Sequence, residues 1–263
     1  MWGALVGDMV GSRFERSPHK SKDFELITPD CRLTDDSILT LAVADALLHG
    51  RDLVDTLHSW WRAYPDAGYG GSFYRWALTG AREPYGSWGN GSAMRVAPVG
   101  WLGGDEAEVL ALADHTAAVT HNHPEGLRGA RAVALAVFWA RQGRPREDMR
   151  ADLQRHFGYD LQRRLADIAP TYQFDVSCQG SVPEALIAFF EASDFEDAVR
   201  GAVALGGDSD TQACIAGAVA EAWFGGVPAV LRAEVLARCD GRQRAVLGAF
   251  DDRVRAGAGR RDI

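Results

Sequence analysis

Two short acidic motifs hold the side chains with the clearest chemical potential. The segment RLTDDSILTLAVADALL, residues 32–48, contains two adjacent aspartates after a threonine, and LGGDSDTQACIAG, residues 205–217, contains two aspartates and a threonine after two glycines. The six polar residues are Thr34, Asp35, Asp36, Asp208, Asp210 and Thr211. Carboxylate and hydroxyl oxygens are the ligands that magnesium, manganese and calcium prefer. Binding of such a divalent cation is therefore one function that these motifs could have.

Either motif alone is also explained by helix capping, because hydroxyls and carboxylates are favoured at a helix N-terminus. The second motif, however, opens a helix of small residues that other helices must pack closely, which predicts that its carboxylates are buried. Buried carboxylates need a partner, and Arg32 is the one cation close to either motif in sequence. A shared metal site is the economical hypothesis. Four aspartates exceed what one magnesium usually takes, which favours two ions; a distant arginine or lysine is the alternative.

Three glycine-rich loops lie between the acidic motifs, and each leads into a predicted helix. They are GYGGSFYRWA from Gly68, PYGSWGNGSAMRVAP from Pro84 and THNHPEG from Thr120. Exposed amides at a helix start bind anions such as a diphosphate, and Tyr85 or Trp88 offers a face for a planar base. The alternative is that the glycines only permit tight turns. For His121 a phosphate contact or a structural hydrogen bond is favoured over metal binding.

Apolar residues recur at helical spacing along nearly the whole chain and strand alternation is almost absent, which predicts an all-α fold. Long irregular segments at 16–33 and 168–182 are of the kind that often carries function. No repeat or linker divides the sequence, so we expect one domain over residues 1–263. The predicted helices cover 3–15, 35–49, 51–63, 70–80, 90–99, 105–119, 124–142, 146–157, 183–191, 194–205, 209–224, 228–237 and 240–256.

Composition narrows the function classes. The net charge of −8 disfavours an extended nucleic-acid-binding surface, which needs a basic stripe. The apolar N-terminal stretch is short and interrupted by Asp8, so it predicts neither a membrane span nor a signal peptide. We therefore expect a cytoplasmic protein, and a monomer.

Taken in order, six segments resemble the ADP-ribosylglycohydrolase family, which includes dinitrogenase reductase-activating glycohydrolase. They are GALVGDMVGSRFE, LTDDSILTLAVADAL, GYGGSF, GNGSAMRVAPVGWL, THNHPEGLRGA and LGGDSDTQACIAGAVAEAWFG, and they span residues 2–225. The resemblance implies a compact orthogonal bundle, here of about 12–13 helices, with a binuclear magnesium or manganese centre in an ADP-ribose cleft.

The resemblance also assigns roles to residues. It places the metal ligands at the six acidic-motif residues, and it matches Glu15 to a glutamate that helps hydrolysis in serine-specific members. From the residues alone, Glu15 could equally cap a helix or pair with Arg13 or Arg16. The substrate-binding positions are Gly70, Gly71, Ser87, Trp88, Gly89, Asn90, Gly91 and His121.

The expected activity is hydrolysis of the glycosidic bond between ADP-ribose and an acceptor on a protein or a small molecule. The residues expected to be catalytic are Glu15, Asp35, Asp36 and Asp210. Two alternatives use the same residues: an ADP-ribose-binding module without activity, and a phosphohydrolase that cuts the diphosphate.

Overall fold

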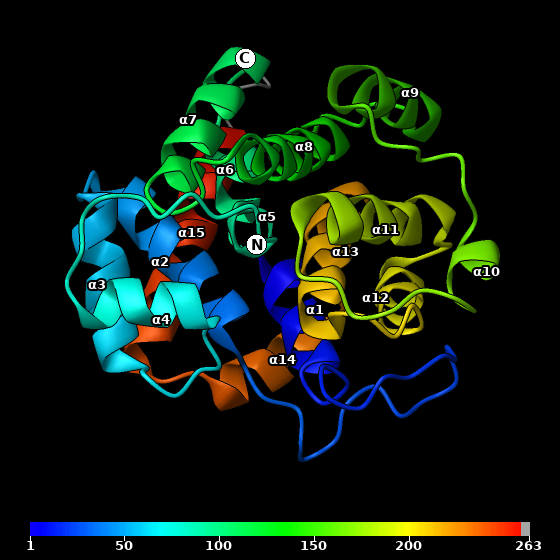
Figure 1. Ribbon diagram of the computed structural model, residues 1–263, viewed down its shortest axis with the longest axis horizontal. Helices are drawn as coiled ribbons and strands as arrows, with labels where there is room; N and C mark the ends of the chain where they lie inside the picture. The colour runs from blue at the N-terminus through cyan, green and yellow to red at the C-terminus, as the bar shows by residue number, and fades with distance from the viewer. Residues whose placement is uncertain (259–263) are drawn as a thin grey trace.

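A computed structural model of the protein describes residues 1–258, which form fifteen α-helices and no strand (Figure 1). The all-α prediction is confirmed. The last five residues of the predicted domain, 259–263, lie outside the described part. The helices are α1 (Trp2–Gly11), α2 (Asp35–His49), α3 (Leu53–Ala63), α4 (Gly71–Leu78), α5 (Gly91–Met94), α6 (Ala97–Leu102), α7 (Glu106–Ala118), α8 (Pro124–Arg141), α9 (Arg146–Phe157), α10 (Leu165–Ile168), α11 (Cys178–Glu191), α12 (Phe195–Val203), α13 (Ser209–Trp223), α14 (Ala229–Arg238) and α15 (Gly241–Ala258).

The helix predicted over 3–15 ends earlier, at Gly11, and two prolines account for two further differences from the predicted helices. The helix expected over residues 90–99 is two helices, α5 and α6, because the ring of Pro98 is incompatible with an unbroken helix through Met94. The helix expected to begin at Pro183 begins five residues earlier, where Ser177 accepts a hydrogen bond from the amide of Gly180. The one-turn helix α10 was not predicted.

Helices α1 and α13 pack against each other at the centre of the molecule, with α2 to α4 on one side and α10 to α12 on the other (Figure 1). Gly3, Gly7 and Gly11 form one face of α1 and contact the backbone of α13 directly. A Cβ atom at Gly7 would lie 1.9 Å from the carbonyl oxygen of Ala213. Glycine is therefore required on this face for the two helices to approach as closely as they do.

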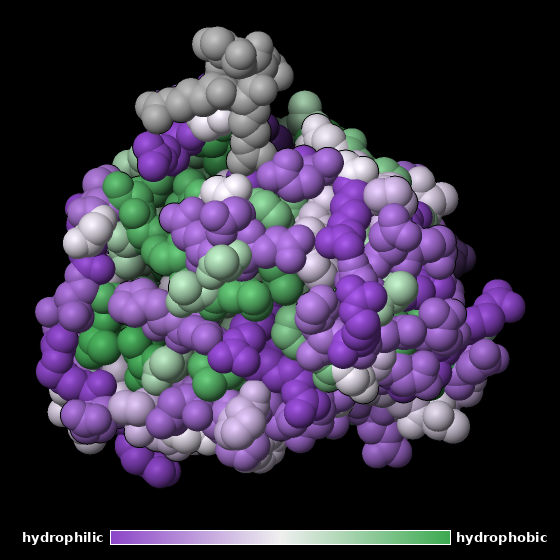
Figure 2. Space-filling view, turned by 90° about the horizontal axis from the view of Figure 1, so that it is seen from above, coloured by the Kyte–Doolittle hydropathy of each residue, from purple (hydrophilic) through white to green (hydrophobic). Residues whose placement is uncertain are grey.

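One hydrophobic core joins these helices, from Met1 at the start of α1 to Phe250 in α15. Hydrophilic residues cover most of the face in Figure 2, and hydrophobic residues show between them, mainly at its left. Within residues 1–258, no helix combines the length and apolar character that crossing a bilayer requires.

Candidate active site

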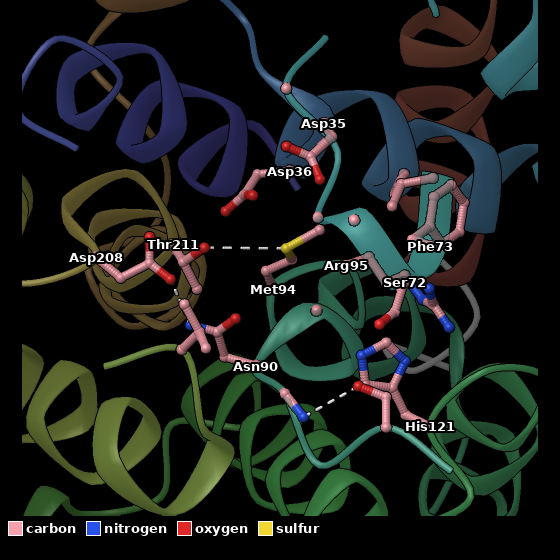
Figure 3. Close-up of a pocket in the computed structure, with 18 of the residues that line it drawn as sticks. Asp35, Asp36, Ser72, Phe73, Asn90, Met94, Arg95, His121, Asp208 and Thr211 are labelled. Atoms are coloured by element: carbon pink, nitrogen blue, oxygen red, sulfur yellow. Dashed lines mark hydrogen bonds between the residues drawn. The ribbon is translucent and has the colours of Figure 1, made fainter. Parts of the chain in front are cut away.

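A cavity of about 530 Å³ opens where the starts of α2, α4, α5 and α13 converge. Every residue that the sequence predicts for the site lines this cavity except Thr34, which is buried at the N-cap of α2. The fold thus brings together side chains that are up to about 200 positions apart in the chain. Figure 3 shows Asp35 and Asp36 facing Asp208 and Thr211 across the cavity.

Asp8, in the middle of α1, fixes the first acidic motif. Its carboxylate accepts hydrogen bonds from the amide of Thr34 (2.9 Å), the hydroxyl of Thr34 (2.6 Å) and the amide of Ser37 (3.1 Å), and it also contacts the Ser37 hydroxyl. The Thr34 oxygen in turn accepts from the amide of Asp36 at 3.3 Å. Asp8 was not among the residues predicted for the site, because nothing in the sequence connects it to the start of α2.

The second acidic motif lies at the start of α13, where Asp208 is the N-cap residue but makes no side-chain cap hydrogen bond. Asp208, Asp210 and Thr211 are 6%, 5% and 4% exposed, which confirms the buried small-residue helix that the sequence predicted. Asn90 donates from its amide nitrogen to Asp208 Oδ2 at 2.7 Å and to Ser181 at 3.1 Å. Asn90, which belongs to the second glycine-rich loop, therefore also fixes the position of Asp208 in the acidic motif.

The acidic end of the cavity is electrostatically strained. Burial raises the pKa of Asp35 to about 8, with a further contribution from Asp8. Burial and the neighbouring Asp210 raise the pKa of Asp36 well above its usual range, and burial and Asp208 do the same for Asp210. None of the ion pairs among residues 1–258 involves these carboxylates, and Asp36 Oδ2 is buried without a hydrogen-bond partner. The structure therefore does not support the distant-cation alternative.

The donor set fits a hard divalent cation. Ionised carboxylates crowded together without a counter-charge are stabilised by such an ion, and the orphaned oxygen of Asp36 has no other partner. The fit rests on this chemistry, since in the described part of the chain no three His, Cys, Asp or Glu side chains already surround a metal position.

We expect added Mg²⁺ to raise the melting temperature of the protein more at pH 8 than at pH 5.5. The raised pKa of Asp35 means that the folded state holds its proton more tightly than the unfolded state, so without metal the stability falls as pH rises from about 4 towards 8. Metal binding requires the ionised form and so opposes that loss most at high pH. Thermal unfolding with and without Mg²⁺ at both pH values measures the effect. An equal shift at both pH values contradicts it.

The start of α4 offers hydrogen-bond donors to the cavity, beside Asp35, whose amide donates to the carbonyl of Ala67 at 2.9 Å. Gly70 is the N-cap of α4 and supplies no side-chain cap, and a Cβ at Gly70 or Gly71 would meet open space. The first amides of α4 therefore have room for an anion in front of them. Ser72, the second residue of α4, also lines the cavity.

Arg95 is a fully buried cation that also lines the cavity, and it was missed by sequence reasoning. One guanidinium nitrogen donates to the carbonyl of Thr116 (2.9 Å) and to the hydroxyl of Thr120 (2.8 Å), while Nε and Nη1 have no hydrogen-bond partner. Burial lowers the pKa of Arg95 to about 10, so the group stays charged near neutral pH. A buried positive charge in the cavity wall, with no carboxylate of the described chain paired to it, favours an anion in the cavity.

His121 is positioned by Thr120, which also binds Arg95. Its Nδ1 lies 2.7 Å from the Thr120 hydroxyl, and its Nε2 would lie 3.1 Å from a Cβ at Gly91, so Gly91 leaves the ring its space. Burial, and then Arg95, lower the pKa of His121 well below its usual value. The imidazole is therefore neutral, as suits a hydrogen-bonding rather than a charged role.

Exposed hydrophobic side chains stand at the mouth of the cavity. Trp88, Phe174 and Val176 are 48%, 52% and 42% exposed, and all three line it. The second long segment is tied to the glycine loop by hydrogen bonds from the amide of Asn90 to the carbonyl of Val176 and from the amide of Cys178 to the carbonyl of Trp88. Phe174 and Val176 were not predicted for the site.

Glu15 lies half-buried just after α1 and lines the cavity. Its charge contributes to the raised pKa values of Asp35, Asp208 and Asp210, so it belongs to the acidic end. Arg13 instead contacts Thr28 and the carbonyl of Glu25, and no ion pair within the described residues joins it to Glu15.

Known proteins are similar to this chain over most of its length. The human protein named ADP-ribosylhydrolase ARH3 is 28% identical, with 85% of this chain and 84% of that protein covered. The Xenopus tropicalis protein of the same name is 25% identical, with 85% of each chain covered. A solved structure titled ADP-ribosylglycohydrolase-related protein complex superimposes with a TM-score of 0.70 at 28% identity, covering 94% of this chain and 93% of that one.

The sequence model described as ADP-ribosylglycohydrolase matches residues 1–260, which is nearly the whole chain. That range includes both acidic motifs and all three glycine-rich loops. On this match, together with the shared all-α fold, the chain belongs to the ADP-ribosylglycohydrolase family.

Proposed function

We propose that this protein is a metal-dependent hydrolase that cleaves the glycosidic bond between ADP-ribose and an acceptor group and releases ADP-ribose. One observation carries the proposal: a single cavity holds a cluster of carboxylates together with the open amide end of α4, a buried arginine and an exposed tryptophan. An ADP-ribose conjugate has matching parts, namely a ribose diol, a diphosphate and a planar base.

The residues that would hold two divalent cations, Mg²⁺ or Mn²⁺, are those of the acidic motifs. Bound there, the ions would act as Lewis acids that bind ribose hydroxyls and stabilise developing negative charge. Asp8 and Asn90 would keep the ligands in place, through Thr34 and Asp208 respectively. The ligand set is Thr34, Asp35, Asp36, Asp208, Asp210 and Thr211.

Cavity residues outside the acidic motifs would orient the nucleotide. The α4 amides after Gly70 and Gly71 would bind the diphosphate, and the buried charge of Arg95 would attract it. The neutral ring of His121 would donate or accept a hydrogen bond. Ser87, Gly89 and Gly91 would shape the same loop around the ligand. Holding the nucleotide rigidly lowers the entropic cost of reaching the transition state.

Glu15 would be the proton acceptor. It lines the acidic end without being buried in it, so its carboxylate can reach a water molecule that approaches the anomeric carbon. Removal of a proton lets the water oxygen bond to that carbon as the bond to the acceptor breaks. The departing acceptor takes up a proton, and free ADP-ribose remains.

The direct test is incubation with defined ADP-ribose conjugates: arginine-linked and serine-linked peptides, O-acetyl-ADP-ribose and an ADP-ribosylated nucleobase. Each is assayed with Mg²⁺, with Mn²⁺ and with EDTA, and products are identified by mass spectrometry. Free ADP-ribose that depends on metal supports the proposal. AMP identifies a phosphohydrolase instead, and tight binding of ADP-ribose without turnover of any conjugate identifies a binding module. The expected partners are thus ADP-ribosylated proteins or small conjugates.

Replacing Trp88 with alanine is expected to raise the KM of the conjugate about tenfold while changing kcat little. An aromatic side chain stacked on a base contributes about 1–3 kcal/mol, and Trp88 is 48% exposed at the cavity mouth, so its loss removes binding without disturbing the core. Steady-state kinetics measures both constants. Tyr74→Ala, at an exposed tyrosine of α4 outside the cavity lining, is the control. An unchanged KM would place the base elsewhere.

A further inference from the structure

A second cavity, of about 490 Å³, adjoins the first. The segment 163–175 and one residue of α11 form its walls, and Phe174 lines both cavities. A ligand that extends past Phe174 from the first cavity would therefore enter the second. The lining residues are Arg163, Asp167, Ile168, Thr171, Tyr172, Gln173, Phe174, Asp175 and Glu184.

The second cavity lies beside the acidic end of the first. The hydroxyl of Tyr172 accepts a hydrogen bond from Gln212 at 2.9 Å, and Gln212 directly follows Thr211. The Tyr172 ring also packs on Gly207, where a Cβ would lie 2.3 Å from it. The proposed bond cleavage occurs at that end, so the group that leaves ADP-ribose would depart near this cavity.

The walls of the second cavity have an excess of negative charge. Among the lining residues, Asp167, Asp175 and Glu184 outnumber one cation, Arg163. A further cation, Lys20, contacts the wall from Tyr172, donating to its carbonyl at 2.6 Å, and the acids still exceed the cations. Arg163 binds one oxygen of Glu184 at 2.8 Å, yet the other oxygen, Oε2, is buried without a hydrogen-bond partner. Glu184 is only 5% exposed, so water does not readily satisfy that oxygen. An unpaired buried acceptor calls for a donor from outside the chain.

The remaining walls suit a long side chain with a cationic tip. Ile168, Tyr172 and Phe174 offer apolar and aromatic surface for an aliphatic stem, and the aromatic faces also attract a cation. A lysine or arginine side chain carries both parts, whereas an anion would face the carboxylates.

We propose that the second cavity binds a lysine or arginine side chain of the ADP-ribosylated polypeptide and so favours acceptors with a basic residue close to the modified one. The inference rests on the proposed glycohydrolase function and specifies its substrate class. Glu184 and Asp175 bind the cationic tip, and Asp167, which is exposed, attracts it at the entrance.

The test compares ADP-ribosylated peptides that differ only in whether the neighbours of the modified residue include lysine or its uncharged isostere norleucine. A small conjugate without a peptide is assayed in parallel. We expect kcat/KM to be about tenfold higher for the best lysine peptide than for its norleucine match, mainly through KM, and the advantage to shrink as salt is added. Equal values for all matched pairs overturn the inference.

Two variants attribute the effect to the cavity. Asp167→Lys alters an exposed side chain and should abolish most of the lysine preference without affecting folding; Glu184→Gln removes the buried charge and should do the same. Both should leave turnover of the small conjugate and the calorimetric affinity for free ADP-ribose unchanged. Asp252→Lys, on α15 and outside both cavity linings, is the matched control. A preference that survives Asp167→Lys and Glu184→Gln also overturns the inference.

The outcomes separate this inference from the function on which it rests. If no conjugate, large or small, releases ADP-ribose, the proposed function fails. If the small conjugate and all peptides react but lysine gives no advantage, only the second cavity's role fails.

Discussion

Replacing Asp210 with asparagine is expected to reduce the metal-dependent release of ADP-ribose by about a thousandfold, while the metal-free protein becomes more stable at pH 8. Loss of one carboxylate ligand removes several kcal/mol of transition-state stabilisation, and about 4 kcal/mol corresponds to that factor. Asparagine keeps the oxygen that accepts from the amide of Thr211. Initial rates at saturating Mg²⁺ and thermal unfolding in EDTA measure the two effects.

The stability gain follows from the sign of the pKa shift. Burial and Asp208 raise the pKa of Asp210 well above its usual value, so the folded protein loses stability as pH rises past the unfolded pKa near 3.8. Asparagine cannot ionise and avoids this loss, so the gain should vanish near pH 4. If activity falls but the variant is destabilised at every pH, Asp210 is a structural residue.

Asp45→Asn is the matched control for that experiment. Asp45 is also a buried aspartate, in α2, but its carboxylate is paired with Arg51 at 2.9 Å and accepts from Trp60 at 3.0 Å. Its replacement should destabilise the protein by about 1–3 kcal/mol and leave the rate per folded molecule unchanged. The two variants thus have opposite effects on stability at pH 8, and only Asp210→Asn lowers activity.

Replacing Gly7 with alanine is expected to destabilise the protein by about 3 kcal/mol and to lower its activity. The new methyl group would lie 1.9 Å from the carbonyl oxygen of Ala213, so α1 and α13 must move apart. Asp8 follows Gly7 directly, and α13 begins beside Asp208, so the same movement separates the two acidic motifs. Urea denaturation gives the free energy of unfolding, and initial rates in native buffer give the activity.

Gly248→Ala is the control for a glycine substitution within a helix. In α15, a Cβ at Gly248 would meet nothing within 4 Å. Alanine there should stabilise the protein by about 0.5–1 kcal/mol, because alanine loses less backbone entropy than glycine on folding. Equal free energies of unfolding for the Gly7 variant and the parent would show that α1 and α13 can separate without cost.

Sequence patterns predicted the helical elements well where the deciding interactions are local. The start of α2 at Asp35 and that of α13 at Ser209 were predicted to the residue, because both follow polar caps and begin strongly helical segments. The helix boundaries near Pro98 and Pro183 were wrong. A proline can begin a helix or lie within its first turns. Pro98 lies at the start of α6, whereas Pro183 lies inside α11, whose start is set by the cap at Ser177.

The composition of the candidate site was largely predictable, but the residues that hold it in place were not. The acidic motifs and glycine loops stand out by residue type and spacing, and every site residue predicted from them except Thr34 lines the cavity. Asp8 and Arg95 each act through contacts between elements that are distant in sequence, so neither has a local signature. Asp8, in α1, binds the start of α2. Arg95, at the end of α5, binds Thr116 in α7 and Thr120 just after that helix.

The sequence by itself determined which side chains could bind a cation, an anion or a base, since that depends on residue type and on the local start of a helix. Only the tertiary structure decided that these side chains share one cavity. The physical reason is the glycine face of α1, which lets α13 approach until backbone touches backbone and so places Asp208 and Asp210 opposite Asp35 and Asp36. Such contact depends on the shape of both helices at once, which no single segment encodes.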